Sequence, residues 1–221
     1  MLNKIKTHII SLIIVLCILV LSSIFNEVII SKFKFFPLGL FTQLFFILFS
    51  FLLIKYFKYQ INYQISISKI IKVVPVTFLS IFGILFLLDL IIITESESDF
   101  FSNMPIKNLL TVLFINCFGE EFLFKGFLQN YYSNFRNIKF KIFKINISYP
   151  VLISGLLFGI MHFAIITTGV IFLSALKVVL SAIVVGLIAG YYYEKYNSLS
   201  IAIIIHFTSN LTSLMYNLTL S

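Results

Sequence analysis

Residues 108–132 read NLLTVLFINCFGEEFLFKGFLQNYY, and this stretch decides the fold. It is long and apolar enough to cross the hydrocarbon core of a bilayer as a single α-helix. Its charged side chains are Glu120, Glu121 and Lys125. Because charged groups are costly at bilayer depth, they usually face a cavity or a partner. The stretch therefore predicts a transmembrane helix that carries part of a functional site.

The composition of the whole chain also indicates a membrane protein. Of its 221 residues, 60% are hydrophobic and 11% are charged, and the mean hydropathy is +1.09. A soluble domain carries about 25% charged residues, and this chain has too little polar surface to cover a core in water. The composition excludes a disordered chain and a soluble enzyme. Cys17 and Cys117 lie in apolar runs without a CxxC spacing, which supports neither a disulfide framework nor a zinc ribbon.

Six further apolar segments accompany residues 108–132, and most are about 20 residues long, the length of a membrane-spanning helix. They are His8–Ile30, Phe36–Phe57, Ile70–Ile93, Ser148–Thr167, Phe172–Tyr193 and Ser198–Leu218. We therefore predict an all-α, polytopic transmembrane helical bundle of about seven helices. The count lies between six and eight, because only a short turn near Gly169 separates the fifth and sixth segments. No linker divides the chain, which predicts a single integral membrane domain over residues 1–221.

The basic residues predict the orientation in the membrane, because cytoplasmic loops are enriched in lysine and arginine. The side that holds the N-terminus carries Lys4, Lys6, Lys55, Lys58, Lys69, Lys72, Arg136, Lys139, Lys141, Lys144 and Lys195. The other side carries Lys32, Lys34, Lys107, Lys177 and an acidic loop, Glu95–Asp99. We therefore expect the N-terminus in the cytoplasm. A lysine-rich, arginine-poor chain is also typical of an AT-rich bacterial genome, which predicts the bacterial plasma membrane.

The inner loop from Arg136 to Lys144 alternates basic residues with Phe and Ile. Two interpretations are open. Either the loop lies against anionic lipid headgroups, or it is a solvated basic loop. A nucleic-acid partner is not predicted, because Arg136 is the single arginine among 16 basic residues and arginine is a leading reader of bases. The expected partner of the helices is the lipid bilayer.

Helical spacing distinguishes the two glutamates of residues 108–132. Glu121 and Lys125 are four residues apart, which places them on one face in the order that favours an ion pair. Glu120 lies about 140° around the helix from Lys125, so it lacks this counter-ion. The difference makes Glu120 the candidate base. The alternative is that the Glu121–Lys125 pair only joins helices.

Two other segments carry a histidine at bilayer depth. In the fifth segment, Phe158 and His162 are one turn apart, and in the seventh, His206 and Asn210 share a face. A lone histidine in an apolar helix is more often a packing residue than a catalyst. Two histidines together with Glu120 indicate a site.

The helices must approach one another for these side chains to meet. Gly155-xxx-Gly159 and Gly186-xxx-Gly190 predict close packing of the fifth and sixth helices. Counted from the inner helix ends at about 1.5 Å per residue, Glu120 and His162 lie about 21 Å deep and His206 about 12 Å deep. His206 meets the other two only if its helix starts earlier or is tilted, or if the site slopes toward the inside.

A carboxylate, two imidazoles and an amide in a semi-dry cavity suit the activation of water for hydrolysis of an acyl compound such as a peptide. Glu120 would take a proton from water that His162 helps to hold, while His206 and Asn210 would donate to an oxyanion. A zinc ion held by Glu120, His162 and His206, with an open fourth position, is the alternative. The HExxH motif is absent, and the spacing leaves both alternatives open.

Three motifs carry a family resemblance: Glu120-Glu121-xxx-Lys125, Phe158-xxx-His162 and His206-xxx-Asn210. Their order and spacing resemble the signature of the CPBP family, the CAAX proteases and bacteriocin-processing enzymes also called Abi proteins, over about residues 105–215. The resemblance implies an all-helical intramembrane endopeptidase that processes peptides or membrane proteins. It implies catalytic roles for Glu120, Glu121, His162, His206 and Asn210, with Lys125 and Phe158 in support. Some accounts of the family assign a zinc ion and the label metalloprotease.

One residue departs from the family pattern, because the first motif of the family ends in arginine and here it ends in Lys125. Lysine keeps the charge but not the bidentate clamp of a guanidinium. If the arginine only neutralises the second glutamate, the chain stays active. If it fixes geometry, the chain is a weak or inactive homologue that acts as a bacteriocin-immunity or scaffold protein. A proton-coupled transporter is a third hypothesis, disfavoured because no internal repeat is evident.

Overall fold

The computed structural model describes residues 2–32, 36–37, 39–92, 105–142, 144–168 and 170–220. Its longer α-helices are α1 (Leu2–Lys32), α2 (Leu40–Tyr56), α3 (Ile67–Ile91), α7 (Tyr149–Met161), α8 (Phe172–Tyr196) and α9 (Leu199–Leu220). Shorter elements are α5 (Ile106–Leu110), η1 (Thr111–Asn116), α6 (Cys117–Glu121), η2 (Phe122–Gln129), η3 (Ser133–Phe135), β1 (Lys139–Ile142), β2 (Ile145–Ser148) and η4 (His162–Thr168). Three predicted features lie outside the described residues: the turn near Gly169, Lys34 and the acidic loop Glu95–Asp99.

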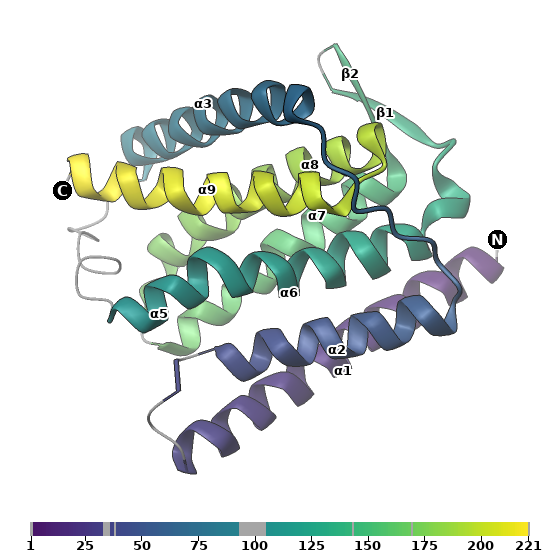
Figure 1. Cartoon of the computed structure of the whole chain (residues 1–221), viewed down its shortest axis with the longest axis horizontal. Helices are drawn as coiled ribbons and strands as arrows, with labels where there is room; N and C mark the ends of the chain where they lie inside the picture. Colours follow the sequence, from purple (N-terminus) through teal and green to yellow (C-terminus); the bar gives the residue numbers. More distant parts are fainter. Residues whose placement is uncertain are drawn as a thin grey trace.

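The elements from α5 to η2 follow one another without interruption and form one long helix, the central helix (106–129), in the middle of the bundle (Figure 1). On one side, α2 contacts α6 and η2 and packs against α1. On the other side, α9 contacts α6 and also packs against α3 and α8. Helix α7 pairs with α8 and contacts η2. The central helix therefore meets both helices that carry the predicted histidine motifs.

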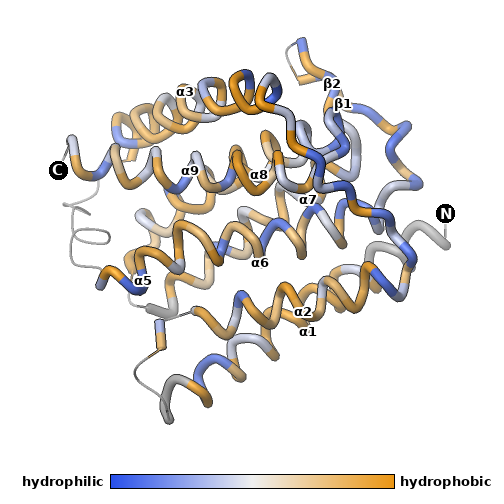
Figure 2. Tube along the Cα trace, in the orientation of Figure 1, coloured by the Kyte–Doolittle hydropathy of each residue, from blue (hydrophilic) through white to orange (hydrophobic). Residues whose placement is uncertain are grey.

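Five of the described helices are long and apolar enough to cross a membrane: Ile9–Ile29, Ile67–Ile91, Tyr149–Ile166, Phe172–Tyr196 and Leu199–Thr219. Helix α2 is apolar but shorter, and the central helix is divided into α- and π-helical stretches. In Figure 2 the helices are mostly apolar, and hydrophilic residues gather at the end of the bundle that holds the two strands. The predicted all-α membrane bundle is confirmed.

The core lies where α2, the central helix and α7 meet. Its large buried side chains include Phe46, Phe124, Phe127 and Phe158 from these elements and Tyr132, which follows the central helix. Large apolar side chains on α1, α2 and α3 remain exposed on their outer faces, as expected for surfaces that meet lipid rather than water. The polar site described below is therefore enclosed by the apolar core.

The predicted close packing of the fifth and sixth helices is confirmed at α7 and α8. A Cβ atom added at Gly155 would lie 3.0 Å from the backbone nitrogen of Leu187, and one at Gly159 would lie 2.8 Å from that of Ile183. A Cβ atom added at Gly186 would lie 3.0 Å from the Cα atom of Gly155. Backbones this close leave no room for side chains, so these glycines set the distance between α7 and α8.

The fifth predicted segment changes conformation along its length. Ser148, predicted as its first residue, is the last residue of β2 and caps α7, because its Oγ accepts a hydrogen bond from the backbone nitrogen of Val151. The α-helix ends at Met161, and a 3₁₀ helix begins at His162. His162 is therefore placed at a change of helix type rather than inside a continuous helix.

The inner loop predicted from Arg136 to Lys144 contains regular structure, a short hairpin beside the helical bundle. Strands β1 and β2 form an antiparallel hairpin. In Figure 1 the hairpin lies at the end of the bundle where α2 ends and α9 begins, and it runs across the direction of the helices. The alternation of lysine with Phe and Ile has a period of two residues, which is the period of a strand with two different faces.

Candidate active site

Two π-helical stretches flank the predicted glutamates. The stretches η1 and η2 have π-helical winding, and α6, which carries Glu120 and Glu121, is the short α-helical stretch between them. A π-helix forms hydrogen bonds between residues five apart, and such stretches are rare but frequent at functional sites. The winding also changes which side chains share a face of the helix.

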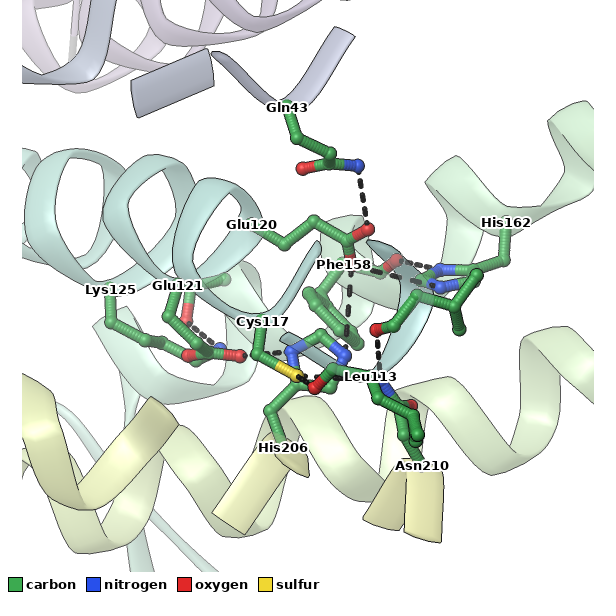
Figure 3. Close-up of polar contacts among 12 residues, drawn as sticks. Gln43, Leu113, Cys117, Glu120, Glu121, Lys125, Phe158, His162, His206 and Asn210 are labelled. Atoms are coloured by element: carbon green, nitrogen blue, oxygen red, sulfur yellow. Dashed lines mark hydrogen bonds and ion pairs between the residues drawn. The ribbon is translucent and has the colours of Figure 1, made fainter. Parts of the chain in front are cut away.

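Glu120 is buried where α2, α9 and the end of α7 approach α6 (Figure 3). Its Oε1 accepts a hydrogen bond from Nε2 of Gln43 at 3.2 Å. Its Oε2 lies 3.9 Å from Nε2 of His162 and 4.0 Å from Nε2 of His206. Within the described residues, this Oε2 has no hydrogen-bond partner. One carboxylate oxygen is therefore held, and the other faces two imidazoles.

The ring of His162 is oriented by the backbone of its own helix. Its Nδ1 lies 2.8 Å from the carbonyl oxygen of Phe158. Because a carbonyl only accepts, Nδ1 carries the hydrogen, and Nε2 is then the acceptor of the neutral ring. Nε2 of His162 is the ring nitrogen that faces Glu120, at 3.9 Å from Oε2.

Glu121 is fully buried and holds the other histidine. Its Oε1 lies 3.1 Å from Nδ1 of His206 in α9. Carboxylate oxygens therefore face both ring nitrogens of His206, that of Glu121 at close range and that of Glu120 at 4.0 Å. His206 is therefore hydrogen-bonded to Glu121 and lies beside Glu120 without a direct hydrogen bond to its Oε2 within the described residues.

Phe158 packs against both histidines from α7. Its ring centroid is 5.3 Å from that of His206, with the planes at 84°, and 5.1 Å from that of His162. The Nζ atom of Lys125 lies 5.4 Å from the same centroid. The ring is buried, so it fixes the positions of the imidazoles and brings Lys125 into contact with the site.

In the described part of the chain, the predicted ion pair between Glu121 and Lys125 is not formed. The ion pair of Glu121 is with His206. The buried Nζ of Lys125 instead donates to Oγ of Ser154 at 3.4 Å, and Ser154 donates to Oε1 of Gln129 at 3.2 Å. The physical reason is that groups on neighbouring helices take both partners, because Nδ1 of His206 in α9 lies 3.1 Å from Oε1 of Glu121 and Ser154 in α7 accepts the hydrogen bond from Lys125.

Asn210 lies one turn after His206 on α9, but its amide group contacts the central helix. Its Nδ2 donates to the carbonyl oxygen of Val112 at 3.1 Å and to Sγ of Cys117 at 3.4 Å (Figure 3). These two bonds use both amide hydrogens. Donation to an oxyanion would require one of them to break.

The part of the chain that carries this site matches a known protein family. A family model described as type II CAAX prenyl endopeptidase Rce1-like matches residues 102–212, half of the chain, and the match includes all three motifs. The chain belongs to this family. The CAAX-protease resemblance carried by the motifs is therefore confirmed, and the Rce1-like family is one of membrane proteases. No curated protein and no solved structure matches the chain.

Gln43 lies outside the residues that match the Rce1-like family, and the sequence motifs do not include it. Helix α2 reaches the site because Gly119 has no side chain: a Cβ atom there would lie 2.9 Å from the backbone oxygen of Gln43 and 3.1 Å from its Cα. One signal was available, because Gln43 is the single amide side chain in the segment Phe36–Phe57. A polar side chain at bilayer depth predicts a partner.

The site of this Rce1-like protein does not present a zinc geometry. Zinc ligands lie about 2.0–2.2 Å from the metal, so two ligands of a tetrahedral site are about 3.4 Å apart. The Nε2 atoms of His162 and His206 lie 3.9 and 4.0 Å from Oε2 of Glu120. Among the described residues, no three His, Cys, Asp or Glu side chains form a group that could hold a metal ion. Zinc binding therefore stays a prediction, which an experiment must test.

Proposed function

We propose that this Rce1-like protein is an active intramembrane endopeptidase in which Glu120 activates water for attack on a peptide carbonyl. The proposal is carried by the position of Glu120 Oε2, which lies 3.9 and 4.0 Å from the Nε2 atoms of His162 and His206. These separations exceed a hydrogen bond, and a water oxygen about 2.8 Å from both atoms of a pair would bridge them. The bond from Gln43 to Oε1 holds the carboxylate in this orientation.

In the proposed reaction, Glu120 takes a proton from water while the water oxygen bonds to the carbonyl carbon. His162 accepts the second hydrogen of that water through Nε2. The proton on Glu120 then passes to the amide nitrogen as the C–N bond breaks, which releases a carboxylic acid and an amine. His206, doubly protonated between the glutamates, stabilises the oxyanion. Glu121 acts through His206 by holding its ring.

The proposed substrate is a peptide or a segment of a membrane protein, because the site lies among membrane helices. The family description names prenylated CAAX proteins as substrates. A bacterial origin, proposed from the lysine-rich composition, favours general peptide maturation, because bacteria generally lack such prenylated proteins. The same proposal places the protein in the plasma membrane with its N-terminus in the cytoplasm.

A second candidate function follows from Lys125. Its Nζ contacts Ser154 rather than Glu121, so the charge of Lys125 does not pair directly with the second glutamate. A weak or inactive homologue that acts as a bacteriocin-immunity or scaffold protein fits this difference. Protection of cells that survives the joint replacement of Glu120, His162 and His206 by alanine would favour this second function.

The deciding experiment compares cleavage of co-expressed candidate peptides by the wild type and by Glu120→Gln. A general base contributes about 10²- to 10⁴-fold, so we expect cleavage to fall at least about 100-fold while the amount of inserted protein stays the same. Glu27→Gln, at an exposed glutamate of α1, is the matched control and should cleave as the wild type does. Unchanged cleavage by Glu120→Gln would overturn the assignment.

The same assay tests the predicted zinc ion. The wild type is treated with 1,10-phenanthroline and then supplied with zinc. Cleavage that persists in the chelator supports a water activated by carboxylate alone. Loss of cleavage that zinc restores would support a metal-bound water and change the role of Glu120 from base to ligand.

A further inference from the structure

The two faces of the β1–β2 hairpin differ in chemistry. Residues directly opposite each other in an antiparallel pair share a face, and successive residues alternate between faces. The ladder pairs Phe140 with Ile147, Ile142 with Ile145, Lys139 with Ser148 and Lys141 with Asn146. The apolar face therefore carries Phe140, Ile142, Ile145 and Ile147, and the basic face carries Lys139, Lys141, Asn146 and Ser148.

The apolar face is open over most of its length. The exposed fractions are 41% for Phe140, 39% for Ile142 and 48% for Ile145, whereas Ile147 is buried. The ring of Phe140 also makes a tilted contact with Tyr149 at the start of α7. A two-stranded hairpin alone is marginally stable in water, and an exposed apolar strand invites aggregation. A further surface is therefore needed to cover this face.

The position of the hairpin indicates which surface this is. Strand β2 runs directly into α7, one of the helices long and apolar enough to span the membrane. The hairpin extends across the direction of the helices at their ends (Figure 1), where hydrophilic residues gather (Figure 2). The end of a membrane-spanning helix marks the level at which lipid headgroups begin. The hairpin thus lies at headgroup level.

The charge of the basic face indicates which lipids it contacts. Lys139 and Lys141 are exposed, and Lys139 and Lys195 border a hollow of about 210 Å³ between the hairpin and α8. Glu194 also borders this hollow but is paired with Nε of Arg136 at 2.9 Å. The remaining charge at the hairpin is positive, which attracts anionic lipid phosphates.

We propose that the β1–β2 hairpin is an interfacial membrane anchor that binds an anionic lipid leaflet. The apolar face enters the boundary between headgroups and acyl chains, and the lysines of the basic face contact lipid phosphates. Large apolar side chains beside lysines are the combination that interfacial segments use. The proposal selects the headgroup interpretation of the loop over the solvated one, and it does not depend on the proposed peptidase activity.

A single introduced tryptophan tests the proposal, because the chain contains none. Phe140→Trp places the reporter on the apolar face, and Lys141→Trp, one residue later, places it on the basic face. Each variant is assembled into nanodiscs of phosphatidylglycerol with brominated acyl chains, which quench tryptophan fluorescence. We expect quenching by the bromines to be at least about twofold stronger for Phe140→Trp. Acrylamide in the water should quench the two variants in the opposite order.

Two more variants make the result independent of one substitution. Ile145→Trp lies on the apolar face of the other strand and should behave like Phe140→Trp. Leu48→Trp, on the exposed side of the apolar helix α2, gives the quenching of a side chain in full contact with lipid. Agreement between the two apolar-face variants excludes a local distortion as the cause.

The anionic lipid is tested with Lys139→Gln and Lys141→Gln together in the Phe140→Trp protein. Losing both charges should weaken bromine quenching in phosphatidylglycerol and leave it unchanged in phosphatidylcholine. Acrylamide quenching as strong for Phe140→Trp as for Lys141→Trp overturns the proposal and indicates a solvated hairpin. Protection of Phe140→Trp from both quenchers also overturns it, because protein then covers the apolar face. None of these readouts uses cleavage, so failure of the peptidase proposal leaves them interpretable.

Discussion

Two charged clusters lie within the bundle, and they differ in how completely their carboxylate oxygens are bonded. Asp89 joins α3 to α8 and α9, because its Oδ1 lies 2.9 Å from Nζ of Lys177 and its Oδ2 accepts a 2.6 Å hydrogen bond from Tyr216. Glu120 has one oxygen bonded to Gln43 and the other facing two imidazoles at 3.9 and 4.0 Å. Both oxygens of Asp89 are therefore bonded, whereas Oε2 of Glu120 has no hydrogen-bond partner within the described residues.

The difference separates a structural contact from a chemical one. Asp89 is 46% exposed, and both of its oxygens join α3 to neighbouring helices. Glu120 is buried, and a buried carboxylate oxygen without a hydrogen-bond partner lowers stability, a cost that a catalytic role explains. Changes in the Glu120 cluster should therefore lower activity more than stability, and changes in the Asp89 cluster should do the reverse.

The largest effect is expected at His206, where two substitutions separate the roles of the ring nitrogens. The amide nitrogen of asparagine replaces Nδ1, and that of glutamine replaces Nε2. His206→Asn keeps a donor for Glu121 but loses the one toward Glu120, so cleavage should fall about 100-fold or more with little change in thermal stability. His206→Gln leaves Glu121 unpaired and should lower the free energy of unfolding by about 1–3 kcal/mol. Identical cleavage rates and unfolding temperatures for the two variants would contradict the division of roles.

A smaller effect is expected at Gln43, a positioning residue that acts through Glu120. Gln43→Leu removes the 3.2 Å bond to Oε1, so we expect about a tenfold lower kcat, an unchanged KM and an altered dependence of kcat on pH. Gln43→His keeps a donor and should recover part of the rate. Ser50→Ala, at another buried polar residue of α2, is the control. A lower amount of folded protein at unchanged kcat would make Gln43 purely structural.

The smallest effect on activity is expected at Tyr216. Tyr216→Phe removes the hydrogen bond to Asp89 and keeps the edge-on contact with Phe82. The free energy of unfolding should fall by about 1 kcal/mol, measured by thermal unfolding in detergent, while cleavage per folded molecule stays at the wild-type level. A drop in cleavage beyond the loss of folded protein would mean that the Asp89 cluster also serves catalysis.

The membrane helices could be predicted because an apolar run of about 20 residues is a local signal. The predicted segments Phe172–Tyr193 and Ser198–Leu218 correspond closely to α8 (Phe172–Tyr196) and α9 (Leu199–Leu220). The hairpin was not predicted, although its residues alternate, because strands of four residues are too short for that period to stand out.

The site could be predicted only in part, because its contacts join helices far apart in the chain. The motifs include His162 and His206, which lie beside Glu120. The shallower depth counted for His206 assumed that the inner ends of the helices are level, and its 3.1 Å contact with Glu121 is inconsistent with that assumption. The partner of Lys125 could not be predicted from helical spacing, because Ser154 lies on another helix, 29 residues further along the chain.

The charges of the central helix also bear on how the protein enters the membrane. Among the described helices it is not one of the five that could span by length and composition alone, because it carries Glu120, Glu121 and Lys125. A charged residue such as lysine at a helix centre costs about 2.5–3.5 kcal/mol during insertion. We therefore expect the translocon to release this helix only together with neighbours. Helix α2, which carries Gln43, is synthesised before the central helix and can pack against it during insertion. Helices α7 and α9, which bring Phe158 and His206, are synthesised later. We therefore expect insertion of the central helix to be cooperative with the helices that complete the site.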